Sequence, residues 1–274
     1  MSGPGDEPPR PSGLPVGDLL EVGPISVNLP VPTSALAIGA HPDDIEFGCG
    51  ATLAKWAAGG CRVHHLVLTD GSKGSWDPDE DLAALVVARA AESRAAAAVI
   101  DGADAERASD RVLFLGRVDG ELVNGPSERR EVAAAIRRVR PAVVLAHDPW
   151  RRYRLHPDHR NAGFVSVDAL VAARDPHFFP DLDLAPHRPE ALLLFEADLA
   201  NHVEDATGFD STKVEALLCH ASQGVSTMGF DANQSGEVSP DAEAFAAKVR
   251  RQLSAHGALG TFPFGEAFHL ITDL

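Results

Sequence analysis

Residues 34–44, with the sequence SALAIGAHPDD, carry the pattern that decides the fold. The first six residues are a short apolar run, which is typical of a strand buried in a parallel sheet. A polar block, His-Pro-Asp-Asp at residues 41–44, follows directly, and residues 50–58 then favour a helix that ends at a pair of glycines. This stretch therefore predicts a strand, a polar turn and a helix, in that order.

The rest of the chain repeats the alternation of strands and helices. Further strands are expected at residues 61–69, 111–115, 141–146 and 191–195, and helices at residues 81–100, 127–139, 159–173, 212–222 and 241–256. Residues 262–270 are expected to form a closing loop and a short strand. Alternation at this spacing indicates βαβ units. We therefore predict a doubly wound α/β fold, with a mostly parallel, Rossmann-like sheet and helices on both of its faces.

Residues 1–33 differ from the rest of the chain. They are rich in proline and glycine and show no periodic apolar pattern, so we expect an N-terminal tail that wraps loosely or stays disordered. Beyond this tail we find no internal repeat and no linker that clearly separates two domains. Residues 34–274 are therefore predicted to form a single domain.

The composition excludes several classes of protein. A net charge of −16 over 274 residues argues against binding to nucleic acid or to anionic lipid. No apolar stretch is long enough to span a bilayer, and the N-terminus lacks the features of a secretory signal. Three cysteines without paired spacing indicate neither disulfides nor a thiolate zinc site. We therefore expect a cytoplasmic protein that binds neither nucleic acid nor membrane, and the sequence leaves open a homo-oligomer.

A second polar block, His-Pro-Asp-His at residues 156–159, has the same form as the first. Each block follows a predicted strand and precedes a predicted helix, and each offers a second ligand three residues after its histidine. Residues three apart on a helical turn face the same way, so His41 with Asp44, and His156 with His159, can each converge. Because the carboxyl ends of parallel strands share one edge of a sheet, both blocks should meet there.

Two histidines and one carboxylate with an open position form the ligand set of a catalytic zinc site. The same set can hold Fe(II) for oxygen chemistry. If Asp44 is a ligand, Asp43 stays free to act as a base, and if His159 is a ligand, His156 stays free to donate a proton. A metal ion that lowers the pKa of its bound water, a carboxylate base and a protonatable histidine together suit hydrolysis. Oxygen activation by Fe(II) does not require the base or the free histidine.

The sequence around these blocks strongly resembles the LmbE/PIG-L family of deacetylases. The resemblance covers most of the chain and is carried by a series of motifs in a fixed order. These are AHPDDIEFG at 40–48, VLTDGSKG at 67–74, Arg89 with Glu92, HPDHR at 156–160, HASQ at 220–223 and EAF at 266–268. The family's usual paired glycines at the first helix appear here as Gly50 and Ala51.

The resemblance implies a role for each matching residue of the two blocks. His41, Asp44 and His159 would hold Zn²⁺, and Asp43 would be the general base. His156 would stabilise the oxyanion or protonate the amine. Asp158 matches the family residue that orients the catalytic histidine.

The resemblance also implies residues that contact the substrate. Arg89 is one candidate, although a salt bridge to Glu92 one turn away would explain it equally well. Arg154 stands where some family members carry a tyrosine, and it would assist an oxyanion or lie on the rim of the site. His220 is a third candidate, with a buried structural histidine as the alternative.

We therefore expect a zinc-dependent hydrolase that removes the N-acetyl group from an amino sugar or sugar conjugate and releases acetate. One alternative is an Fe(II) oxygenase with the same ligands. Another is a non-catalytic sugar-binding protein with a vestigial metal site, although no ligand or base of the motif is lost. A dinucleotide cofactor is not expected, because no Gly-x-Gly-x-x-Gly motif follows the first strand.

Overall fold

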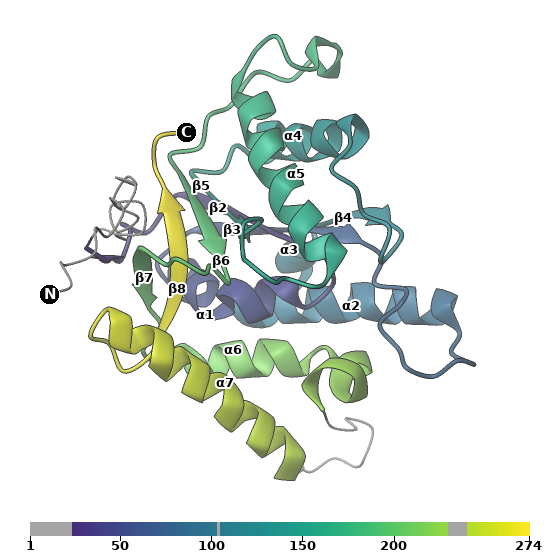
Figure 1. Cartoon of the computed structure of the whole chain (residues 1–274), viewed down its shortest axis with the longest axis vertical. Coiled ribbons are helices and arrows are strands. Elements are labelled where there is room, and N and C mark those ends of the chain that lie inside the picture. Colours follow the sequence, from purple (N-terminus) through teal and green to yellow (C-terminus); the bar gives the residue numbers. More distant parts are fainter. Residues whose placement is uncertain (1–23, 103–104, 230–239) are drawn as a thin grey trace, which may run out of the picture.

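The computed structural model describes residues 24–102, 105–229 and 240–274, and its centre is one eight-stranded sheet (Figure 1). The strands lie in the order β1-β7-β8-β6-β5-β2-β3-β4. Five of the neighbouring pairs are parallel, and β8 runs antiparallel to both β6 and β7. The strands are β1 (Ser26–Val27), β2 (Ser34–Gly39), β3 (Arg62–Thr69), β4 (Val112–Arg117), β5 (Val143–His147), β6 (Ala191–Phe195), β7 (His202–Asp205) and β8 (Gly265–Ile271). The predicted mostly parallel sheet is confirmed.

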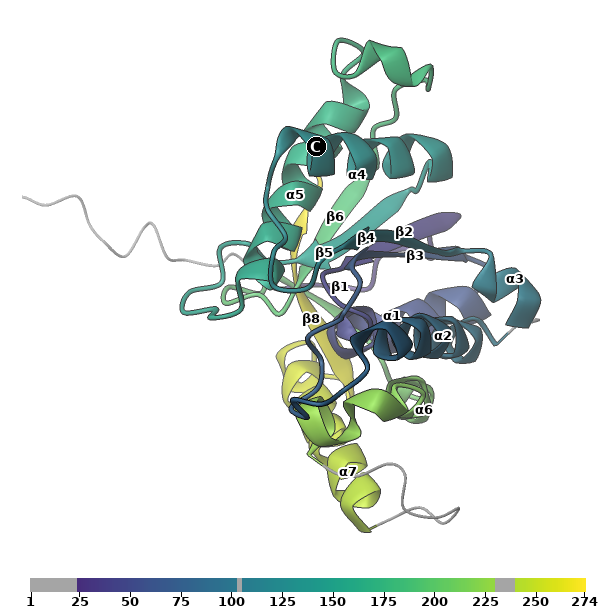
Figure 2. The same ribbon diagram turned by 90° about the vertical axis from the view of Figure 1, so that its right-hand side faces the viewer.

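Helices cover both faces of this sheet, as the doubly wound fold requires. Figure 2 shows α4 (Pro126–Val139) and α5 (Pro157–Arg174) on one face, and α1 (Asp44–Ala58) and α2 (Leu82–Asp101) on the other. In both views α6 (Asp210–Leu218) and α7 (Pro240–Leu259) lie beyond α1. Helix α7 also packs against β8 and β7 at one end of the sheet. The short α3 (Ala105–Ser109) precedes β4.

The central strand β2 explains why the sheet has two cores. All six of its residues are buried, and its side chains alternate between the two faces. Leu36 and Ile38 pack into the cluster under α4 and α5, whereas Ala35 and Ala37 pack into the cluster that contains residues of α1. The small alanines on the second face let α1 lie close to the sheet, directly after the first polar block.

The chain changes direction across the sheet at β2. It runs from β2 outward to β3 and β4, and then returns to β5 on the other side of β2. The pairing of β2 with β5 is parallel, with Ile38 opposite Ala146. The loops after β2 and β5 therefore leave in different directions. The place where the strand order reverses in this way is the topological switch point, and ligands of α/β proteins bind there.

Some predicted boundaries differ from the structure. The strand β1 lies inside the predicted tail, residues 1–33, and pairs with β7, so the described fold begins before residue 34. The rest of that tail, residues 1–23, lies outside the described residues. The strand β7 was missed because only four residues form it. The helices α1 and α5 begin earlier than predicted, within the two polar blocks.

Helix α1 is broken at Cys49, whose φ of −149° and ψ of 18° are not helical. The second half of the helix therefore starts anew, with backbone N–H groups that lack helical partners. The buried carboxylate of Glu266 accepts hydrogen bonds from Ala51 N at 3.2 Å and Thr52 N at 2.7 Å. Glu266, from the predicted EAF motif, thus caps the second half of α1 from β8.

Lys213 of α6 completes this arrangement. Its Nζ lies 2.5 Å from the Glu266 carboxylate and donates to the backbone carbonyl of Phe47 at 2.7 Å. The lysine therefore binds the carbonyl end of the first half of α1 while it neutralises the acid that caps the second half. The pair holds α1 in the position that brings Asp44 to the sheet edge.

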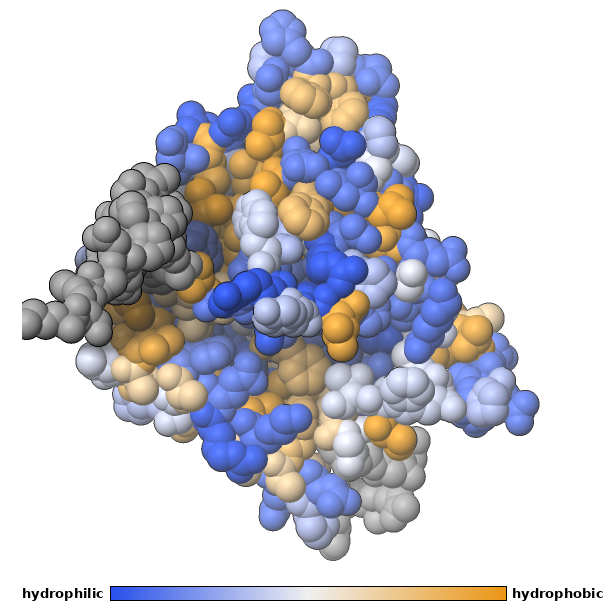
Figure 3. Space-filling model, in the orientation of Figure 1, coloured by the Kyte–Doolittle hydropathy of each residue, from blue (hydrophilic) through white to orange (hydrophobic). Residues whose placement is uncertain are grey.

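None of the helices in the described residues is long and apolar enough to cross a membrane. On the face seen in Figure 3, hydrophilic side chains surround separate small apolar patches.

Breaking the buried pair should cost far more stability than breaking an exposed one. Replacing Lys213 by Met leaves the Glu266 carboxylate buried without its cation, so we expect a loss of about 3–5 kcal/mol in the free energy of unfolding. Lys73→Met is the matched control, because Lys73 pairs with Glu121 at an exposed site and should contribute less than about 1 kcal/mol. Urea denaturation of both variants measures the difference. Equal losses would contradict the structural role of Lys213.

Candidate active site

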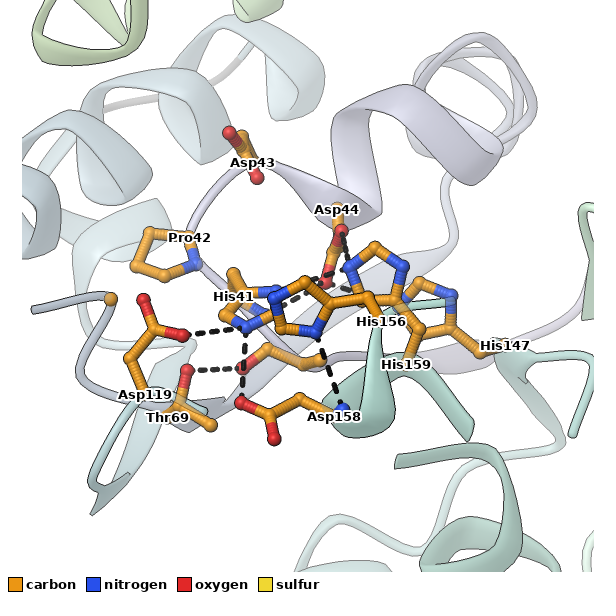
Figure 4. A network of polar contacts seen from close by, with 12 residues as sticks. His41, Pro42, Asp43, Asp44, Thr69, Asp119, His147, His156, Asp158 and His159 are labelled. Atoms are coloured by element: carbon orange, nitrogen blue, oxygen red, sulfur yellow. Dashed lines mark hydrogen bonds and ion pairs between the residues drawn. The ribbon is translucent and has the colours of Figure 1, made fainter. Parts of the chain in front are cut away.

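Both predicted blocks lie at the carboxyl edge of the sheet, at the switch point between β2 and β5. Residues 41–44 connect β2 to α1, and residues 156–159 form the start of α5. They open on a cavity of about 540 Å³, whose lining includes His41, Asp43, Asp44, His156 and His159. The predicted meeting of the two blocks, more than a hundred residues apart in the chain, is therefore observed (Figure 4).

Three side chains converge on one point, and they are the three that the family resemblance assigns to the metal. Nδ1 of His41 lies 3.1 Å from Nε2 of His159 and 3.4 Å from Oδ2 of Asp44. Nε2 of His159 lies 3.1 Å from Oδ1 of Asp44. Ligand atoms about 2.0–2.1 Å from a tetrahedral Zn²⁺ lie about 3.3 Å from one another, so the spacing of these three side chains fits such an ion, with the two histidines facing different oxygens of Asp44.

Neighbouring side chains could also take part in metal binding. Groups with suitable ligand atoms are His41 with His156 and His159, Asp44 with His147 and His159, and His41 with Asp119 and Asp158. All three groups overlap with the set of His41, Asp44 and His159. We favour that set because each of its pairs is in contact, and because the other nitrogen of His41 is already occupied by carboxylates.

The second nitrogen of His41 faces two buried carboxylates. Its Nε2 lies 3.1 Å from Oδ1 of Asp119 and 3.2 Å from Oδ2 of Asp158. Burial by itself would lower the pKa of His41, but these hydrogen bonds and Asp44 outweigh it and raise the pKa well above its usual value. A carboxylate on the far nitrogen is typical of a metal-binding histidine, because it leaves the near nitrogen with a lone pair for the ion.

The placement of Asp158 differs from the role that the resemblance implies. Its carboxylate accepts hydrogen bonds from Gly120 N at 2.6 Å and Leu122 N at 3.2 Å, and it contacts His41. Asp158 and His156 are joined by a hydrogen bond from the backbone N–H of Asp158 to Nδ1 of His156, at 3.3 Å. In the structure Asp158 therefore orients a predicted ligand, and its backbone orients His156.

The two adjacent aspartates have different surroundings. Asp43 has a φ of 116°, a left-handed conformation that is strained for a residue other than glycine. In Figure 4 its side chain points away from the cluster, whereas that of Asp44 points into it. Arg89 holds this turn, because its guanidinium donates to the carbonyls of Pro42 at 2.6 Å and Gly71 at 2.9 Å and lies 3.5 Å from Asp43.

These surroundings shift the pKa values of the two aspartates in opposite directions. Burial raises the pKa of Asp43 to about 6, and Arg89 only partly opposes this effect. Burial also acts on Asp44, but His159 and His147 outweigh it and hold the pKa of Asp44 well below its usual value. Neighbouring acids with opposed pKa values suit different tasks, one as a proton acceptor and the other as a permanent anion.

His156 lies at the exposed side of the cavity. Its ring meets the edge of His41 at a centroid distance of 4.6 Å and stacks on His159 at 4.9 Å. Burial, His41 and His159 together lower the pKa of His156. Because Nδ1 accepts the backbone N–H of Asp158, the neutral ring carries its proton on Nε2 and can donate a hydrogen bond from there.

The three predicted substrate contacts lie in different places. Arg89 lines the cavity, and its alternative partner Glu92 instead accepts hydrogen bonds from Ser222. Arg154 lies behind the cluster, where it pairs with Glu196 and its Nη1 lies 2.9 Å from Nδ1 of His159. His220 is fully buried, with Nε2 3.2 Å from Glu46. A substrate contact by Arg154 or His220 stays a prediction, since in the structure both contact protein groups behind the cavity wall.

Three further polar residues of the site lie outside the sequence motifs: Asp119, His147 and Glu196. His147 is the last residue of β5, Glu196 directly follows β6, and Asp119 lies two residues after the end of β4. Each is thus among the first polar residues at the carboxyl end of a parallel strand. The predicted strand ends therefore carry a signal for all three residues, even though none of them belongs to a His-Pro block.

The raised pKa of Asp43 has a consequence for stability. With a folded pKa of about 6 and an unfolded pKa of about 3.9, the folded metal-free protein binds more protons between these values. The Asp43 charge should therefore destabilise the protein above pH 6, by about 1–3 kcal/mol, and have no effect below pH 4. We expect Asp43→Asn to raise the melting temperature of metal-free protein at pH 7.5, and this gain to vanish near pH 4.

Asp119→Asn is the control, because its expected effect on the melting temperature has the opposite sign. Burial by itself would raise the pKa of Asp119, but the hydrogen bond and charge of His41, the backbone N–H of Lys73 and the charge of Arg89 together outweigh it and lower the pKa, so the Asp119 charge stabilises the fold at neutral pH. This variant should melt at a lower temperature than the wild type at pH 7.5. If Asp43→Asn also melts at a lower temperature than the wild type at pH 7.5, the Asp43 charge does not destabilise the fold.

Known proteins resemble this chain in sequence and in structure. Residues 36–170 match the family described as PIG-L, GlcNAc-PI de-N-acetylase. Diacetylchitobiose deacetylase of Thermococcus kodakarensis is 34% identical over 191 residues, which are 69% of this chain and 69% of that protein. A 1D-myo-inositol 2-acetamido-2-deoxy-alpha-D-glucopyranoside deacetylase of Mycolicibacterium vanbaalenii is 34% identical over 156 residues, 50% of this chain and 54% of the relative.

The likeness extends to a solved structure. N,N'-diacetylchitobiose deacetylase from Pyrococcus horikoshii superimposes with a TM-score of 0.75 and 25% identity, and the match covers 88% of this chain and 84% of that one. Its fold, together with the sequence matches and the two His-Pro blocks at the switch point, leads to one assignment. The chain belongs to the PIG-L/LmbE family of deacetylases.

Proposed function

We propose that the protein is a zinc-dependent deacetylase that hydrolyses the N-acetyl group of an amino sugar or sugar conjugate. The observation that carries this proposal is the convergence of His41, Asp44 and His159 beside Asp43 and His156 in one cavity. Relatives named as deacetylases of N-acetylated sugars support the substrate class. The Fe(II) oxygenase and vestigial sugar-binding alternatives gain no support from these relatives.

In this proposal His41, Asp44 and His159 hold the metal ion. Two histidines and one aspartate with an open position favour zinc. The bound ion would lower the pKa of water and polarise the acetyl carbonyl. Location in the cytoplasm, a homo-oligomer and the lack of nucleic-acid binding stay predictions from the sequence.

The chain's own residues would perform the proton transfers. Asp43 accepts a proton from the water whose oxygen attacks the carbonyl carbon. The Nε2–H of His156 donates a hydrogen bond to the oxyanion that develops on the carbonyl oxygen. The carbon–nitrogen bond then breaks, the nitrogen takes up the proton that Asp43 accepted, and acetate and a free amine leave. Arg89 keeps the turn around Asp43 in place through its bonds to two backbone carbonyls.

Two variants of the adjacent aspartates should separate base from ligand. Asp43→Asn should retain about one metal ion per chain but lose about 10²–10⁴-fold in turnover, because an amide cannot accept the proton. Asp44→Ala should lose most of its metal, and excess zinc should restore part of its activity. Elemental analysis and acetate release from a panel of N-acetylated amino sugars measure both effects. The assigned roles are reversed if Asp43→Asn empties the site and Asp44→Ala does not.

His156→Ala should also leave the metal in place. Loss of its hydrogen bond to the oxyanion should lower kcat by about 10²–10⁴-fold. His177→Ala is the control, since His177 is an exposed histidine in the loop after α5. Steady-state rates of acetate release compare the two variants. Unchanged turnover in His156→Ala would leave this histidine with a structural role only.

A further inference from the structure

His147 is a buried histidine that neither polar block contains. It ends β5 and is 1% exposed. Its Nε2 lies 3.1 Å from Oδ2 of Asp44, the oxygen that also accepts the backbone N–H of His41 at 2.7 Å. The other oxygen of Asp44, Oδ1, faces Nε2 of His159. The Asp44 carboxylate therefore bridges two imidazoles, one with each oxygen.

The ring of His147 is fixed on every side. It stacks on His159 at a centroid distance of 4.5 Å and an angle of 13°, and it meets the edge of Phe195 at 4.5 Å. Its Nδ1 lies 3.2 Å from Nη1 of Arg154 and 3.3 Å from Oε2 of Glu196, and these two residues form an ion pair with each other. Strand β5 and these contacts together leave the ring little freedom to turn.

These neighbours determine which nitrogen carries a proton. A guanidinium only donates, so Nδ1 accepts from Arg154 when the ring is neutral, and the ring proton is then on Nε2. If the ring carries two protons, Nε2 again holds one of them. The remaining case is a neutral ring that donates from Nδ1 to Glu196. The lone pair on Nε2 would then face a lone pair on Oδ2 of Asp44 at 3.1 Å. Without a cation between them, that arrangement is repulsive.

We propose that His147 is a positioning residue, which donates from Nε2 to Oδ2 of Asp44 and thereby presents Oδ1 to the metal. The inference rests on the proposed metal site. It also assigns Glu196 the task of holding His147, and Arg154 the task of holding both His147 and His159 by their Nδ1 atoms, instead of a contact with substrate. Outer hydrogen bonds of this kind orient a ligand, and their loss commonly weakens metal affinity by about 10–100-fold.

The rival role for the same side chain is that of a fourth metal ligand, since Asp44, His147 and His159 have ligand atoms close enough to share an ion. Glutamine distinguishes the two roles. Its amide N–H can reach the position of Nε2–H and donate to Asp44, but zinc ligands in proteins are Cys, His, Asp and Glu. His147→Gln should therefore keep a hydrogen-bond donor and lose a ligand.

The test measures metal affinity in competition with a chromophoric chelator, for Zn²⁺ and Co²⁺, without any substrate. We expect His147→Ala to bind both ions about 10–100-fold more weakly than the wild type. His147→Gln should recover affinity to within about threefold, and its Co²⁺ complex should keep the visible absorption spectrum of the wild-type complex. The matched control is His202→Ala, because His202 is equally buried and bonds Glu204 at 2.9 Å on β7, outside the cavity. This control should leave metal affinity unchanged.

Each other result overturns the inference in a distinguishable way. Wild-type affinity in His147→Ala would show that the carboxylate needs no donor. An affinity in His147→Gln as low as in His147→Ala, with an altered Co²⁺ spectrum, would make His147 a ligand. Melting of the metal-free variants shows that each one is folded. If wild-type protein binds neither ion, the proposed metal site itself is contradicted, whereas the results above leave that site intact.

Discussion

The parallel pairing of β2 with β5 is the contact on which the active site depends. At this pair the chain reverses its direction across the sheet, so the loops that follow the two strands separate and leave a crevice. Their register, with Ile38 opposite Ala146, aligns the two strand ends. The first polar block and His147 therefore face each other, and the loop after β5 brings the second block to the same place.

The crevice gathers imidazoles and carboxylates that would be costly to bury one at a time. The Asp44 carboxylate, for example, contacts His147 and His159. Asp43 differs, because burial raises its pKa and the nearby Arg89 only partly compensates. This imbalance suits the proposed role of Asp43 as a general base, since an acid with a pKa near neutrality both accepts and releases a proton readily.

Positions far from the cavity keep this arrangement in place. The break of α1 at Cys49 would leave helix ends unpaired in the core, and the buried pair of Glu266 and Lys213 satisfies them. That explains on physical grounds why an acidic residue lies in β8, the antiparallel strand next to β6. Glu266 thus supports the turn that carries Asp44, although its side chain belongs to the other end of the chain.

The strand–turn–helix order and the meeting of the two blocks could be predicted from the sequence, because apolar periodicity and the rules of parallel sheets are local or topological. The family resemblance also proposed His41, Asp44 and His159 as metal ligands. The contacts that pair each carboxylate with a histidine, and the presence of His147, Asp119 and Glu196 in the site, became visible only in the folded chain. Such contacts depend on register and side-chain direction across strands distant in sequence, and no spacing along the chain encodes those distances.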